Sequence, residues 1–416
     1  MKSTLLEYFQ KEVFFMNKNQ ILNVKYACVN AAYLMLICAT SGYAYNYLSQ
    51  CGFTDGQTGT IITVISILGV LGQTFFGSII DKSKSLDERN FISITMGISI
   101  TACILLAVLP SSSFLTILLC VVGFTSTATG MPFLSSMAFI YEQEGFTINY
   151  GLGRGIGSAA YAVGSALLGK LWASFGKSAL PYYVILFALA TLLLVRWMPA
   201  AKKAESTSSS DSSLSYGAFF KKYKAIILPA AGMVCIYFCH MLVNTYFAKI
   251  IMNIIGDSAV SVESVQGTAL FIQAMCELPT MFAFGWLINK FTINRLLIFC
   301  AVAFSVKHAL LLVCSSVPML YAIMVLQMLT YAILCPGSVY LANEIVSAED
   351  RNKGQAIIGI TGTAGGLLSS FIGGQLFQLT SISNVVLVGT IVSTIGSVLL
   401  VIGVLQLKKK AILAKR

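Results

Sequence analysis

Long apolar runs follow one another along almost the whole chain, and short polar connections separate them. An α-helix rises about 1.5 Å per residue, so about 20 apolar residues are needed to cross the ~30 Å hydrocarbon core of a bilayer. The pattern therefore predicts an all-α membrane protein with twelve transmembrane helices, at residues 26–48, 57–80, 90–109, 113–141, 149–174, 179–198, 224–252, 262–288, 294–314, 318–343, 355–379 and 384–407.

The composition agrees with a chain whose main solvent is lipid. Of 416 residues, 57% are hydrophobic and only 10% are charged, whereas about a quarter are charged in an ordinary soluble protein. The 11 cysteines lie mostly inside the predicted helices and form no CxxC pair, so we expect them to pack as small apolar side chains. We predict neither a metal site nor a cofactor.

The net charge of +11 is distributed along the chain in a way that indicates topology. Most of the 27 Lys and Arg residues fall at the N-terminus, in the even-numbered connections or at the C-terminus. By the positive-inside rule, both termini are predicted to lie in the cytoplasm, with the protein in the cell (plasma) membrane. The basic excess then faces anionic lipid, and nucleic acid is not predicted as a partner.

A polar, serine-rich stretch at residues 200–216 is typical of a flexible linker. It divides the chain into an N-terminal six-helix bundle at residues 1–199, a cytoplasmic linker at 200–222 and a C-terminal six-helix bundle at 223–416.

The two predicted bundles share short sequence matches. The motif GSIIDK at residues 77–82 ends the second predicted helix, and GWLINK at 285–290 ends the eighth. The glycines of the fifth helix also match small residues of the eleventh at nearly the same offset. Such a repeat predicts two pseudo-symmetric halves.

Charged residues inside predicted membrane helices are the strongest functional signal. A charge at mid-bilayer costs about 2.5–3.5 kcal/mol on insertion scales, so it is expected to face the protein interior. Of 16 Asp and Glu residues, only Glu277 lies well inside a predicted helix. Basic or titratable candidates are Arg154, Lys307, His308 and His240. Lys249 lies near the outer end of the seventh helix, where its side chain is expected to reach outward to water.

Two six-helix halves, a linker and G-x-x-x-[DN]-K turns after helices two and eight together resemble the major facilitator superfamily, over essentially the whole chain. Gly77, Asp81 and Arg89 resemble the loop motif of that family between helices two and three, although the basic cluster is looser here. The resemblance implies that these three residues form a conformational switch between inward and outward states.

Local motifs resemble the lactose permease-like branch of the superfamily, and the run 343–356 resembles the wider branch of nucleoside and phenylpropionate permeases. Met-Cys-Glu-Leu at 275–278 places Glu277 at the substrate-contacting carboxylate of that branch. Tyr-Gly-Leu-Gly-Arg at 150–154 gives Arg154 the role of its substrate arginine and Tyr161 that of a nearby aromatic. Ser-Val-Lys at 305–307 makes Lys307 a basic residue near the proton site.

The chain also departs from this pattern. Ser135 and Ser136 occupy the region of the expected helix-four carboxylate, and Asn244 stands at one of the helix-seven aspartate positions. The helix-ten coupling pair of His and Glu is absent, because Gln327, Thr330 and Ile333 occupy that stretch. Lactose and coupling by that pair are therefore not predicted.

Residue chemistry then assigns the coupling. Glu277 is the best proton carrier by elimination. Burial disfavours the charged form of a carboxyl group, whereas nearby basic groups favour it. Lys307 is expected to tune it, and His308 or His240 could share the proton because imidazole titrates in the working range. Arg154 and Glu277, on opposite halves, could both meet a polar ligand.

No enzyme motif is present in the sequence. GSALLGK at residues 164–170 is one residue from a phosphate-binding loop, but Leu171 replaces the required Ser or Thr and no strand precedes it. The fifth helix also lacks the proline of the exporter motif. We predict a monomeric carrier that imports a sugar, oligosaccharide or nucleoside by proton symport with alternating access. A drug or metabolite efflux antiporter and an uncoupled uniporter remain alternatives.

The predicted site residues fall into three groups. The substrate-binding residues are Arg154, Glu277, Tyr161, Asn244 and His240; the proton-coupling residues are Glu277, Lys307 and His308; and the switch residues are Gly77, Asp81 and Arg89.

Overall fold

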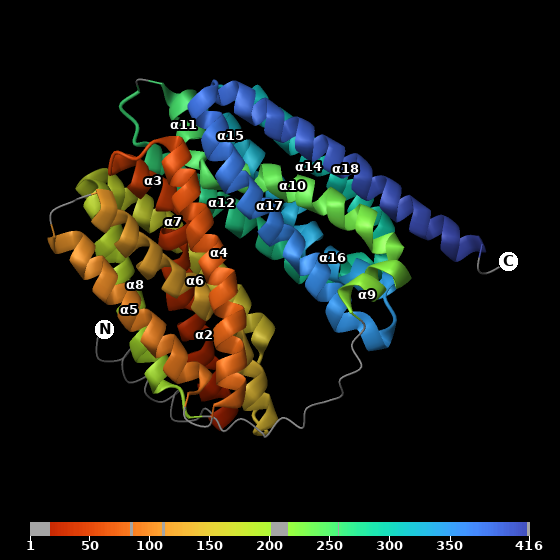
Figure 1. The fold of residues 1–416 in the computed structure, drawn as a ribbon, viewed down its shortest axis with the longest axis horizontal. Helices are drawn as coiled ribbons and strands as arrows, with labels where there is room; N and C mark the ends of the chain where they lie inside the picture. Colours follow the sequence, from red (N-terminus) through yellow and green to blue (C-terminus); the bar gives the residue numbers. More distant parts are fainter. Residues whose placement is uncertain (1–16, 84–85, 110–112, 201–214, 257, 414–416) are drawn as a thin grey trace, which may run out of the picture. The chain divides into compact units, whose positions relative to one another are not determined.

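The computed structural model describes residues 17–83, 86–109, 113–200, 215–256 and 258–413. In these ranges the chain is built from helices and contains no strand (Figure 1). By length and composition, 10 helical segments of the described chain can cross a membrane, or up to 11 if one bent pair counts as a single span. The segment Tyr150–Trp197 holds two of the predicted spans. The all-α membrane fold is therefore confirmed.

The contacts divide the chain into two compact units, which we describe separately. The first unit contains residues 1–41, 65–164 and 178–208, and the second contains 42–64, 165–177 and 209–416. The second unit thus includes one end of the first, second and fifth predicted spans. The division at residues 200–222 stays a prediction, and most of that linker lies outside the described residues.

The first unit is held together by contacts of α5 with α6 and α8, and of α2 with α8. Its helices are α2 (Lys18–Ile37), α4 (Asp55–Lys82), α5 (Glu88–Val108), α6 (Ser113–Gln143), α7 (Tyr150–Phe175) and α8 (Ala179–Trp197), with α4 and α7 extending into the second unit. A short 3-10 turn, η2 (Gly176–Ser178), joins α7 to α8.

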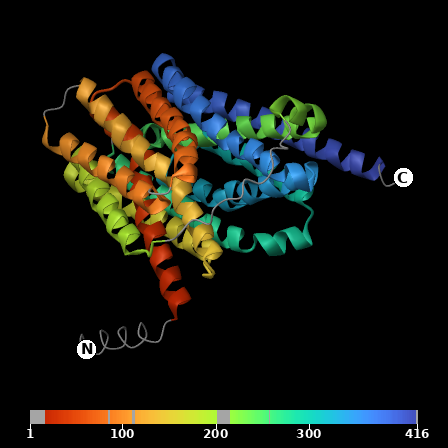
Figure 2. The same cartoon turned by 60° about the horizontal axis from the view of Figure 1, so that its bottom comes forward.

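In the second unit, α10 packs against α17 and α18, and α14 packs against α18. In both views α18 runs beyond its neighbours towards the C-terminus (Figure 2). The helices are α3 (Ala44–Gln50), α9 (Tyr216–Lys222), α10 (Ile227–Thr245), α11 (Phe247–Ile255), α12 (Val262–Phe282), α13 (Phe284–Lys290), α14 (Ile293–Leu312), α15 (Val317–Val325), α16 (Tyr331–Ile345), α17 (Arg351–Leu379) and α18 (Ile382–Leu413).

Several predicted spans are interrupted helices. The first is α2, a π-helical turn η1 (Cys38–Gly42) and α3, and it begins at Lys18 because Asn17 and Gln20 form a reciprocal capping box. The eighth bends by 52° between α12 and α13, just after Pro279. Proline cannot donate the backbone hydrogen bond that a straight helix needs at that point.

Glycine permits a close contact between α10 and α18 in the second unit. A Cβ on Gly232 of α10 would lie 2.6 Å from the carbonyl oxygen of Gly396 of α18, and the reverse substitution would produce the same clash. In lipid, helices associate through van der Waals packing and not through the hydrophobic effect. Small residues favour this packing because they let two backbones approach closely. These glycines therefore set how closely α18 packs on α10.

Candidate functional site

A chain of three hydrogen-bonded side chains lies inside the second unit. Lys307 of α14 donates from Nζ to Oε1 of Gln327, and Gln327 donates from Nε2 to Oε1 of Glu277 of α12 at 2.7 Å. Lys307 is only 2% exposed, Gln327 is fully buried and Glu277 is half-buried. We call Lys307, Gln327 and Glu277 the polar chain.

A break in the tenth span positions the middle residue of the polar chain. The 3-10 turn η4 (Leu326–Leu329) separates α15 from α16 and packs against α12. The hydroxyl of Thr330 donates to the carbonyl oxygen of Leu326 at 3.0 Å, and the thiol of Cys300 donates to the carbonyl oxygen of Thr330 at 3.1 Å. These bonds satisfy backbone groups at the break, as irregular backbone within a membrane requires.

The members of the polar chain compensate one another. A buried ammonium loses its hydration, so it needs a hydrogen-bond acceptor and a compensating charge nearby. Gln327 supplies the acceptor, and the carboxylate of Glu277 lies within electrostatic reach of Lys307. Removing one member of a buried ionic set costs about 3–5 kcal/mol, because the remaining charge stays uncompensated.

The two predicted histidines are buried beside this chain. The Nδ1 of His308 shares a hydrogen bond of 2.8 Å with the hydroxyl of Ser393 on α18. His240 of α10 stacks on Tyr331 with 5.3 Å between ring centroids, and its Nε2 lies 3.2 Å from the side-chain nitrogen of Asn244. The structure thus brings Asn244 and His240 together, as an i, i+4 pair on one helix face.

Arg154 and Tyr161 lie on α7, in the part that belongs to the first unit. Seven residues apart, they fall on the same helix face. The Nη1 atom of Arg154 is buried and has no hydrogen-bond partner among the described residues. Gly153 is buried against the ring of Tyr26, where a Cβ would lie 2.6 Å from two ring carbons. An unpartnered buried guanidinium nitrogen is suited to an oxygen of a bound solute.

The predicted switch residues lie where α4 ends and α5 begins. Gly77 lies within α4, and the side chain of Asp81 falls outside what the structure describes. Arg89 donates from Nη1 to the carbonyl oxygen of Met198 at 2.9 Å, while Asp87 caps α5 by accepting from the amide of Asn90 at 2.6 Å. Arg89 therefore ties the start of α5 to the end of α8.

Lys249, expected to reach outward to water, has a charged partner in the protein. Its ammonium pairs with the carboxylate of Asp55 at the start of α4, and the hydroxyl of Tyr45 donates to the same carboxylate at 2.6 Å. The two charged side chains are 21% and 18% exposed. A partner so close is favoured over water because both groups are largely desolvated already. Sequence reasoning missed this pair because Asp55 precedes the predicted helix.

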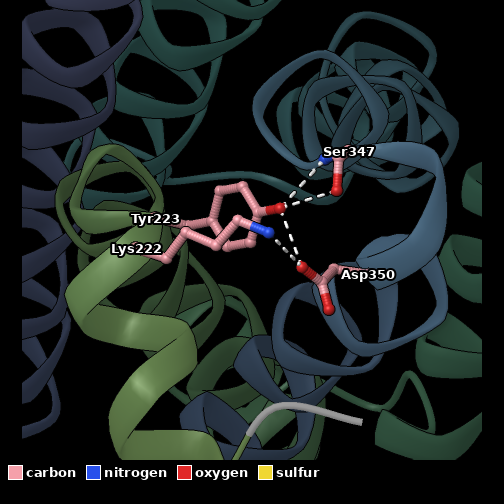
Figure 3. A network of polar contacts seen from close by, with 4 residues as sticks. All are labelled: Lys222, Tyr223, Ser347 and Asp350. Atoms are coloured by element: carbon pink, nitrogen blue, oxygen red, sulfur yellow. Dashed lines mark hydrogen bonds and ion pairs between the residues drawn. The ribbon is translucent and has the colours of Figure 1, made fainter. Parts of the chain in front are cut away.

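A second ionic contact in this unit joins the end of α9 to the residue that precedes α17 (Figure 3). The carboxylate oxygen Oδ2 of Asp350 accepts from Lys222 at 2.9 Å and from the hydroxyl of Tyr223 at 2.8 Å, and Ser347 lies 2.7 Å from that hydroxyl. Hydrogen bonds from Lys222 and Tyr223 lower the pKa of the Asp350 carboxyl. Hydrogen bonds with Tyr223 and Asp350 raise the pKa of the Lys222 ammonium.

Comparison with known proteins identifies the class. A model of the MFS_1 like family matches residues 26–388. The fold resembles a mutant form of the nucleoside transporter NupG, with TM-score 0.78 and 14% identity over 92% of this chain and 99% of that one. It also resembles a POT family transporter in complex with 5-aminolevulinic acid, with TM-score 0.72 and 11% identity over 92% and 96%.

A third solved structure has the same fold. It is a bacterial homolog of the human lysosomal transporter Spinster, with TM-score 0.68 and 12% identity over 95% of this chain and 99% of that one. No curated protein matches the sequence. The match to the MFS_1 like family and the membrane-spanning helices identify a multi-pass membrane transporter. The chain belongs to the MFS_1 like family of the major facilitator type.

Proposed function

We propose that this protein is a proton symporter that imports a small polar solute by alternating access, with a nucleoside as the favoured cargo and a sugar as the second candidate. The observation that carries the proposal is the polar chain, in which the amide of Gln327 links a carboxylate within a membrane span to a buried ammonium. A carboxyl group so placed can hold a proton whose release depends on nearby charges.

Cargo chemistry is inferred from the polar and aromatic groups around these spans. The stacked pair of His240 and Tyr331, with Asn244 next to it, offers a ring surface and amide hydrogen-bonding groups. A nucleoside has an aromatic base and a hydroxyl-rich ribose that such groups can bind. The fold similarity to a transporter named for nucleosides supports this choice over a sugar.

The remaining predicted residues take separate roles in this proposal. Arg154 anchors the solute through its unpartnered nitrogen, and Tyr161 contacts it from the same face of α7. Lys307 and His308 adjust the proton site formed by Glu277. Gly77, Asp81 and Arg89 influence the rate of conformational exchange more than solute affinity.

The membrane and the assembly are further parts of the proposal. We place the protein as a monomer in the cell membrane with both termini in the cytoplasm, where its basic connections contact anionic lipid. The N-terminal bundle, the linker and the C-terminal bundle then follow the division predicted at residues 200–222.

Uptake of radiolabelled uridine into proteoliposomes under an imposed inward proton gradient tests the cargo and its direction. Competition by unlabelled adenosine, lactose and phenylpropionate defines the class. We expect gradient-driven accumulation of uridine that adenosine suppresses and lactose does not. Suppression by lactose alone would move the cargo to a sugar. Accumulation only with an outward gradient would support the efflux antiporter, and equilibration without any gradient effect would support the uniporter.

A further inference from the structure

Gln327 connects the two charged members of the polar chain. Its amide oxygen accepts from the ammonium of Lys307, and its amide nitrogen donates to Glu277 at 2.7 Å. An ammonium can only donate a hydrogen bond, so the amide oxygen must face Lys307 and the NH₂ group must face the carboxylate. Lys307 therefore determines which end of the amide Glu277 meets.

We propose that Gln327 is a positioning residue that relays the charge of Lys307 to Glu277, so that proton binding at Glu277 is governed by all three side chains as one unit. The inference rests on the proposed function and deepens it, because it names what controls the proton site. Hydrogen bonds to charged groups are the strong ones, and linked bonds in a poorly screened interior strengthen one another.

The position of Gln327 supports a relay over a filler role. The side chain is fully buried and comes from η4, whose irregular backbone places it against α12. A glutamine that merely filled space would not have both ends of its amide bonded to opposite charges. Neither the sequence motif nor the family resemblance assigned Gln327 a role.

Other titratable groups surround the polar chain. Four of them interact electrostatically with Lys307 or Glu277: Cys276 on α12, His240 and Cys239 on α10, and His308 on α14. The two histidines are already hydrogen-bonded, to Asn244 and to Ser393 respectively. Gln327 is the group whose described hydrogen bonds join Lys307 to Glu277.

Infrared difference spectroscopy of the purified protein in lipid nanodiscs, without any solute, tests the relay directly. A protonated carboxyl group gives a C=O band, and the part lost in Glu277→Gln belongs to Glu277. In Gln327→Leu we expect this band to persist to higher pH by about one to two pH units, because the carboxylate loses a charge-assisted hydrogen bond. Lys307→Met is expected to act in the same direction.

The double variant Lys307→Met/Gln327→Leu separates a relay from two independent effects. For groups that act as one unit, its shift equals that of either single variant and not their sum. It also removes the buried ammonium together with its acceptor, so it avoids the unpaired buried ammonium that Gln327→Leu leaves. Gln273→Leu is the matched control. Gln273 lies on α12 one turn before Glu277, and its amide donates to Asn244.

Each result decides the matter. Additive shifts, an equal shift in Gln273→Leu, or a band that moves to lower pH in Gln327→Leu would overturn the relay. The last of these would mean that Lys307 pairs directly with Glu277 once the amide is gone. These outcomes leave Glu277 as a proton carrier. If Glu277→Gln removes no band at any pH, the relay and the proposed proton role both fail.

Discussion

Lys249 of α11 forms an ion pair with Asp55 at the start of α4, although 194 positions separate them in the sequence. Both lie in the second unit, so the pair joins a segment of the predicted N-terminal half to the C-terminal helices. Tyr45 of α3 completes the contact by donating to the same carboxylate. The ion pair therefore connects residues from the two predicted halves of the sequence.

Breaking this pair is expected to destabilise the protein. Because both side chains are about one-fifth exposed, Lys249→Met should lower the free energy of unfolding by about 1–3 kcal/mol, between the values for exposed and buried pairs. Denaturant unfolding in detergent measures the change. The double variant Asp55→Asn/Lys249→Met should recover part of the free energy of unfolding that Lys249→Met alone loses. Strictly additive losses in the double variant would show that the two groups do not interact.

The contact of Lys222 with Asp350 predicts a specific pH dependence of stability. The pKa of Asp350 is lowered in the folded protein, so its contribution is present above the unfolded value of about 4 and is lost as pH falls through the folded pKa. The pKa of Lys222 is raised, so its contribution is present below about pH 10 and is lost as pH rises through the folded pKa.

Thermal unfolding of Asp350→Asn across pH tests that window. We expect the melting temperature of the variant to lie below that of the unchanged protein by a constant amount between about pH 5 and pH 9, with the difference closing below about pH 4. Glu349→Gln, which changes the adjacent exposed carboxylate, is the control and should show no such dependence. A difference that grows as the pH is lowered would contradict the account.

The glycine contact between α10 and α18 predicts a steric effect. Gly232→Ala places a methyl group against the backbone of Gly396 and Leu400, so it should cost about 1–3 kcal/mol of stability as overpacking does. Gly359→Ala on α17 is the matched control, because a Cβ there meets nothing within 4 Å. The control should be neutral or stabilising by up to about 1 kcal/mol. Equal effects of the two substitutions, measured by denaturant unfolding, would rule out close packing at Gly232.

Solute binding is expected to depend on the shape of the Arg154 side chain as well as on its charge. Arg154→Gln is expected to weaken uridine binding by about 10- to 100-fold, the loss of one hydrogen bond to a charged group. Arg154→Lys should restore little, because an ammonium lacks the planar fork of donors. Equilibrium binding of labelled uridine measures both. Wild-type affinity in Arg154→Gln would remove Arg154 from the solute site.

Hydropathy predicted the fold well because the cost of burying polar groups in lipid accumulates residue by residue over each span. Glu277 and Lys307 could be found in the sequence for the same reason, since a charge within a span is rare and costly. The breaks in the helices were not predicted. The turn at Leu326–Leu329 has three apolar residues beside Gln327 and neither glycine nor proline, so its sequence gives no sign of a break.

The remaining parts of the candidate site depend on contacts between distant segments. Gln327 is polar and stands out within its span, but the sequence does not show that its two hydrogen-bond partners lie on other helices. Asp55 and Lys249 likewise carry no local signal of pairing. Such partners are chosen by tertiary packing, which a single sequence does not display.

The most direct test of the central claim is the external pH of lightly buffered, de-energised cells that express the protein, recorded while uridine is added. The account predicts transient alkalinisation as protons enter with uridine, and its loss in Glu277→Gln at equal expression. Uptake of labelled uridine by the unchanged protein without alkalinisation would contradict proton symport. Equal alkalinisation in Glu277→Gln would contradict the role of Glu277.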